Sequence, residues 1–214
     1  MNHFHSDHLL SSEAVRVLGV LIEKEYSTPD YYPLTLNALV TGCNQKSNRH
    51  PVVTFSESTA MAALDELLRE RLSGHASVSG SRAQKFRHAA AQRWNLERPA
   101  LAVLASLLLR GPQTVGELRT HTSRMVTFES MEQVAEALTV LMEQENPLVA
   151  GLARRPGQKG ERFGHLLSGE LPEEDTASPI DSDAHGGSST ELEDIRERLT
   201  RLETEFEAFK RQFE

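Results

Sequence analysis

The sequence predicts a mostly helical α+β protein of two tandem winged-helix domains, followed by an acidic linker and a C-terminal coiled-coil helix. Three observations support this prediction. The order of three helices and a hairpin occurs twice, the charge changes sharply after residue 168, and the end of the chain carries a heptad pattern. We expect a flexible N-terminal segment at 1–10, winged helices at 11–93 and 94–168, a disordered acidic linker at 169–189 and a coiled-coil helix at 190–214.

The first domain begins with an amphipathic helix. Ser11 or Ser12 caps an apolar stripe over 14–22, and the helix ends before Pro29. Pro33, at a first-turn position, predicts a short second helix. Ser56 caps a third helix that carries apolar residues at helical spacing as far as residue 72. Alternating residues on both sides of Gly80 and Ser81 then predict a β-hairpin.

The second domain repeats this order. We expect helices at 101–109, 114–119 and 130–144, and strands at 148–152 and 162–166. Phe55 recurs as Phe128 and Phe86 as Phe163, at offsets of 73 and 77 residues. The clearest insertion lies between the second and third helices of the first domain, which therefore carries a longer loop.

Composition excludes several classes of protein. Lys and Arg total 23 against 31 Asp and Glu. Up to residue 168 there are 18 basic and 17 acidic residues, and beyond it 5 basic and 14 acidic. The single cysteine, Cys43, excludes an internal disulfide framework and a cysteine-rich zinc site, and favours a reducing, cytoplasmic location. No uncharged run is long enough for a membrane helix. No catalytic constellation emerges, so we expect neither an enzyme nor a bound metal or cofactor.

The C-terminal segment has apolar residues at alternating spacings of three and four, which is the seam of a heptad coiled coil. We therefore expect it to form a homo-oligomer. A parallel dimer is weakly favoured by the charges beside the seam, while trimers, an antiparallel arrangement and docking on the protein's own body remain alternatives. The seam residues are Leu192, Ile195, Leu199, Leu202, Phe206, Phe209 and Phe213.

The inserted loop of the first domain is polar. Its side chains are those of Asn44, Gln45, Lys46, Ser47, Asn48 and Arg49. Either they bind a ligand, or their amides hold the loop's own backbone as turns and caps. Cys43, at one end of the loop, fits a small apolar residue at a helix end better than a nucleophile.

Several segments resemble YceH-like bacterial proteins, a family of uncharacterised function. The segments that carry the resemblance are 32–39, 43–49, 108–114 with 116–119, and 152–154 with 156–157. The similarity extends over nearly the whole chain. It implies tandem winged helices with a C-terminal coiled-coil helix, and it implies no established activity.

The charges on the third helices argue against reading of DNA bases. The second of these helices has three glutamates, with Glu129 just before it, and no Lys or Arg occurs between Met125 and Ala153. Carboxylates repel phosphates, whereas helices that enter the major groove present Arg, Lys, Asn or Gln.

The basic residues lie instead on the two hairpins and in the inserted loop. We therefore predict that wing cations contact the phosphates of double-stranded DNA. The alternative function is a protein-protein adaptor, in which the winged helices and coiled coil are docking surfaces. Trp94 is expected to pack between the two domains. The predicted nucleic-acid-binding residues are Lys46, Arg49, Arg82, Lys85, Arg87, Arg154, Arg155, Lys159 and Arg162.

Overall fold

The computed structural model describes residues 9–76, 83–152 and 160–169. The chain divides into two units, Met1–Leu171 and Pro172–Glu214, and every described residue lies in the first. About half of the described residues are helical, and the strands form two small antiparallel sheets. The predicted mixed α+β class is thus confirmed, while the coiled-coil residues and the linker beyond Gly169 lie outside the described part. No helix in that part is long and apolar enough to cross a bilayer.

The first half of this unit is built on α1 (Ser12–Ser27). Ser11 caps it, because its hydroxyl accepts a hydrogen bond from the Ala14 amide at 3.1 Å. Next come a 3-10 turn (Pro29–Tyr31), β1 (Leu34–Thr35), α2 (Leu36–Cys43), α3 (Glu57–Arg69), β2 (Ser73–Ala76) and β3 (Lys85–His88). The sheet order is β1-β3-β2, so the hairpin also pairs with the short strand that precedes α2.

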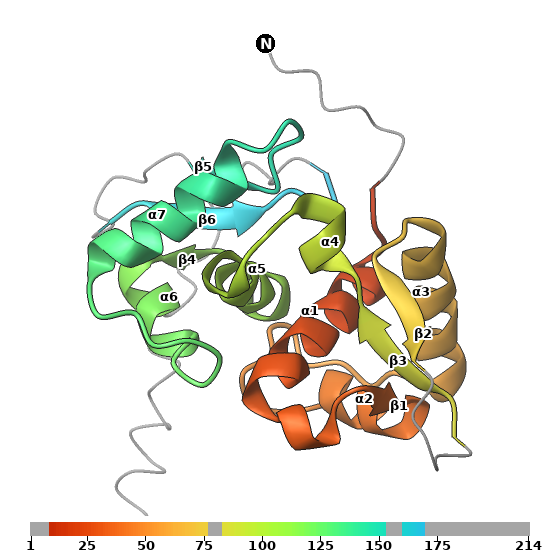
Figure 1. Cartoon of the computed structure of the whole chain (residues 1–214). Coiled ribbons are helices and arrows are strands. Elements are labelled where there is room, and N and C mark those ends of the chain that lie inside the picture. Colours follow the sequence, from red (N-terminus) through yellow and green to blue (C-terminus); the bar gives the residue numbers. More distant parts are fainter. Residues whose placement is uncertain (1–8, 77–82, 153–159, 170–214) are drawn as a thin grey trace, which may run out of the picture. The chain divides into compact units, whose positions relative to one another are not determined.

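The second half repeats this order (Figure 1). It comprises α5 (Arg98–Arg110), β4 (Gln113–Thr114), α6 (Val115–His121), α7 (Met131–Met142), β5 (Val149–Leu152) and β6 (Arg162–His165). The sheet order is β4-β6-β5. Phe86 lies opposite Leu34 in the first sheet, and Phe163 lies opposite Gln113 in the second. The repeat detected through Phe86 and Phe163 therefore corresponds to equivalent positions on the two central strands.

Two local predictions were wrong. Pro33 does not begin the second helix: the hydroxyl of Thr35 accepts from the Ala38 amide, so the helix starts at Leu36 and Leu34–Thr35 pairs with β3. The segment between the two halves also contains a short helix that we did not expect, α4 (Ala90–Trp94). It ends at Asn95, which has a left-handed conformation with φ of 50°. A two-residue strand is too short to leave a periodic pattern in the sequence.

The core lies where α1 packs against α5, near the centre of Figure 1. Every residue from Ala14 to Ile22 and from Ala100 to Leu109 is buried. Each of these helices packs against its own half on one side and against the partner helix of the second half or the first half on its opposite side. Both helices are therefore apolar around most of their circumference. The two halves therefore share one continuous core.

Candidate functional site

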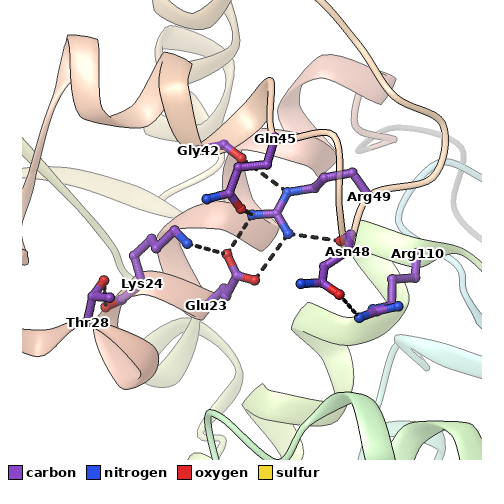
Figure 2. A network of polar contacts seen from close by, with 8 residues as sticks. All are labelled: Glu23, Lys24, Thr28, Gly42, Gln45, Asn48, Arg49 and Arg110. Atoms are coloured by element: carbon purple, nitrogen blue, oxygen red, sulfur yellow. Dashed lines mark hydrogen bonds and ion pairs between the residues drawn. The ribbon is translucent and has the colours of Figure 1, made fainter. Parts of the chain in front are cut away.

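The inserted loop of the first half is held by a buried ion pair (Figure 2). The Arg49 guanidinium donates to both carboxylate oxygens of Glu23 on α1, at 2.6 and 3.1 Å. It also donates to the backbone oxygen of Gly42 at 3.1 Å and to the side-chain oxygen of Gln45 at 2.8 Å. The Arg49 side chain is completely buried. Burial acts to raise the pKa of Glu23, but the hydrogen bonds and charge of Arg49 outweigh it and lower that pKa.

The same loop joins the two halves. The Asn48 side-chain oxygen accepts a hydrogen bond from Arg110 at the end of α5, and the His50 amide donates to the Leu109 carbonyl at 2.8 Å. Arg16 on α1 donates to the Pro51 carbonyl at 2.6 Å. Burial, with the nearby charge of Arg49, lowers the pKa of Arg110. The loop thus connects α1 with α5 at the junction of the halves.

These contacts correct part of the predicted site. Arg49 is buried and fully bonded, so it does not lie on a surface that phosphates could reach. Asn44 pairs with the backbone of Phe55, donating to its carbonyl and accepting from its amide at 2.9 and 2.7 Å. Asn44, Gln45, Asn48 and Arg49 therefore hold the loop in place, as in the capping alternative. Within this loop, Lys46 and Ser47 are the exposed side chains that make no hydrogen bond to another described residue.

The open face of the first sheet carries two cations. Phe86 and His88 of β3 point into the core, while Lys85 is half-buried and Arg87 is exposed. Arg87 lies opposite Gly74 and Lys85 opposite Ala76 on β2. Because these partners on β2 have small side chains or none, they do not cover Arg87, and they leave Lys85 partly exposed.

The second sheet is different. The position of Arg87 is taken by Gly164, and Arg162, at the position of Lys85, donates to the Pro112 carbonyl at 2.8 Å. Arg162 is thus partly occupied in holding β4. The remaining predicted wing residues, Arg82, Arg154, Arg155 and Lys159, lie outside the described residues.

A polar cluster around the buried side chain of His88 was not predicted. The Ala90 amide donates to Nδ1 of His88, so Nε2 carries the proton that is shared with Glu25. This bond lowers the pKa of Glu25 against the opposing effect of burial, and the charge of Arg87 adds to the lowering. The Tyr32 hydroxyl accepts from the His88 amide at 2.7 Å. Because Glu25 lies 63 residues before His88, no local sequence signal indicates the pair.

His165, the counterpart of His88 in the second half, has a buried Nδ1 with no hydrogen-bond partner among the described residues. Burial lowers its pKa to about 4, so the ring is neutral at neutral pH.

Cys43 lies inside the structure at the end of α2 and is fully buried. Burial raises the pKa of its thiol to about 12, and the thiolate is the form that reacts. We therefore expect no reaction of the native protein with Ellman's reagent at pH 8 and stoichiometric reaction in urea. Rapid labelling of the folded chain would show that Cys43 is accessible and would contradict its assignment as a small apolar residue.

Trp94, in the segment between the two halves, contributes to the wall of an open cavity of about 420 Å³. Trp94 is half-buried and packs on the core between the halves, and Leu72 and Leu148 are among the other lining residues. No group of three His, Cys, Asp or Glu side chains in the described residues is arranged to hold a metal ion.

The fold and these contacts define a class of protein: a repeated unit of helices and a small sheet, whose two copies share one core and are joined by a loop that the Arg49–Glu23 ion pair holds. Residues 10–158 match the model of the family DUF480, described as proteins of unknown function. A UPF0502 protein of Geobacter metallireducens is 49% identical over 201 residues, covering 92% of this chain and 88% of the relative. One of Solibacter usitatus is 43% identical over 209 residues, covering 97% and 100%. The chain belongs to this bacterial DUF480/UPF0502 family, which confirms the resemblance to a bacterial family of uncharacterised function.

Proposed function

We propose that the protein is a non-enzymatic, DNA-associated regulator made of two winged helices, in which the first sheet contacts phosphates. The element order supports the winged-helix assignment. Each half has a helix, a short strand, two further helices and a hairpin, and the short strand pairs with the second hairpin strand. In this assignment α3 and α7 hold the position of recognition helices.

The proposal depends chiefly on Lys85 and Arg87. Both project from β3 beside small partners on β2, and residues 83–96 contain no acid. The α3 helix exposes Glu57 and Asp65, so backbone contact by the sheet is favoured over reading of bases by the helix. Lys46 remains a predicted contact, as do the wing residues outside the described part.

The test is a fluorescence-anisotropy titration of a random-sequence 30-base-pair duplex with the full chain at several salt concentrations. The logarithm of the binding constant should fall linearly with the logarithm of salt. Replacing Lys85 and Arg87 together by alanine should reduce the magnitude of this slope by about 2, because two phosphate contacts are removed.

The matched control is Arg69→Ala with Arg124→Ala, which removes two exposed arginines from elsewhere in the same unit. This pair should leave the slope nearly unchanged. If both double variants reduced the slope equally, binding would depend only on overall charge. Absence of DNA binding at low salt would eliminate the DNA-associated function.

A second candidate function, docking of a protein partner, is favoured by one observation. Of the seven large apolar side chains that are exposed in the described residues, four lie on the third helices. These are Leu68 on α3, and Met131, Val140 and Met142 on α7. Self-association through the C-terminal seam is a separate prediction.

A further inference from the structure

The outer surface of α7 combines exposed apolar side chains with unpaired acids. Met131 and Met142 are 43% and 38% exposed and share one side of the helix, whereas Val140, 45% exposed, lies on the other side of the acidic residues. The inner surface of α7 is fully used, since Val134, Ala137, Leu138 and Leu141 are buried against the second half. The outer surface has no partner among the described elements.

The arrangement of these residues follows from helical geometry. Residues three, four or seven apart share one side of a helix. Glu132, Glu136 and Glu143 therefore form one row along the outermost side. Met131, Ala135 and Met142 form an apolar edge next to this row, and Met131 lies beside Gly116 at the start of α6.

The acidic row is not neutralised by its neighbours. Arg119 of α6 acts on Glu132, but its guanidinium is engaged with the backbone oxygens of Phe128 and Glu129 at 3.2 and 2.8 Å. A hydrogen bond from Ser130 lowers the pKa of Glu132, which keeps this carboxylate charged. Glu136 and Glu143 have no ion-pair partner among the described residues.

We propose that this side of α7 binds a cationic amphipathic helix of a partner protein. Such a helix would place its apolar stripe on Met131, Ala135 and Met142 and a row of Lys or Arg against the glutamates. The charge excludes two other occupants: DNA phosphates would be repelled, and a second copy packed through the same surface would bring two acidic rows together. The inference rests on the docking function proposed above and is independent of contact between the first sheet and DNA.

The test uses three fluorescein-labelled 18-residue peptides that share one helical leucine pattern, with Lys, Gln or Glu at every other position. Anisotropy with the full chain should show that the Lys peptide binds most tightly. Glu136→Gln with Glu143→Gln should weaken that binding by about tenfold. Glu57→Gln with Asp65→Asn, the same change of charge on α3, should weaken it twofold or less.

A third double variant, Met131→Gln with Met142→Gln, tests the apolar edge and should also weaken binding of the Lys peptide. Equal losses from the α3 and α7 charge variants would overturn the proposal, because binding would then follow overall charge. If the Gln peptide bound as tightly as the Lys peptide and depended on the Met pair, docking would stand and the cationic partner would be wrong. Failure of all three peptides, or self-association that the Met pair abolishes, would overturn the proposed partner.

Discussion

Replacing Arg49 by alanine is expected to lower the free energy of unfolding by about 3–5 kcal/mol, the range for removing one partner of a buried ion pair. The Glu23 carboxylate would lose both donors of the guanidinium, and the backbone oxygen of Gly42 would lose the bond from Nε. Lys24 lies 3.1 Å from one carboxylate oxygen of Glu23 and would compensate only in part, because it bonds that oxygen alone, whereas Arg49 donates to both. Urea unfolding followed by far-UV circular dichroism measures the change.

Two comparisons separate the ion pair from the general effect of removing a large side chain. Arg69→Ala, at an exposed arginine of α3, should change stability by about 0.5 kcal/mol or less. Adding Glu23→Gln to Arg49→Ala should recover part of the lost stability, because it removes a half-buried charge that has lost its main partner and keeps only Lys24. If Arg49→Ala behaved like the surface control, the loop would be held by its backbone contacts alone and the ion pair would be incidental.

The sequence predicts contacts between residues that are close together along the chain, and it does not predict contacts between residues that are far apart along it. Helix starts at Ser11, Ser56 and Ser130 were predictable because a cap and the amide it binds lie within three residues. The partner of Arg49 lies 26 residues away, and Asn48 meets Arg110 across 62. Such pairs depend on how helices pack, which spacing along one segment does not encode.

The same reasoning explains the error over Arg49. A polar loop with Lys46 and Arg49 has the composition of a phosphate-binding surface, and composition does not distinguish an arginine exposed to solvent from one that pairs with a distant acid. The opposite case is β3, where the alternation that predicted a strand also matches the burial: Phe86 and His88 are buried, whereas Lys85 and Arg87 are not. The periodicity of a sequence indicates which side of a strand or helix a residue occupies, whereas the charge of a residue does not indicate whether it is buried.

Gly19 should be the second most sensitive position, with Gly19→Val expected to cost about 2–3 kcal/mol through overpacking. A Cβ at residue 19 of α1 would lie 2.9 Å from Cγ and Cδ2 of Leu109 and 3.1 Å from Cβ of Leu108 on α5. These distances are shorter than ordinary carbon contacts, and two of the three atoms lie close to the backbone, so relief requires the helices to separate. The change would therefore weaken the core that the two halves share, and urea unfolding measures it.

A double-mutant cycle identifies the cause. In a Leu109→Ala background the same Gly19→Val change should cost at least about 1 kcal/mol less, because the side chain that it meets has been removed. Gly116→Val on α6 is the matched control: its nearest contact would be the flexible end of Met131 at 3.6 Å, so steric strain is small there. If the costs of Gly19→Val and Leu109→Ala were additive, the two helices would adjust freely to the added side chain. Close contact between α1 and α5 would then not explain why a glycine occupies the middle of a buried helix.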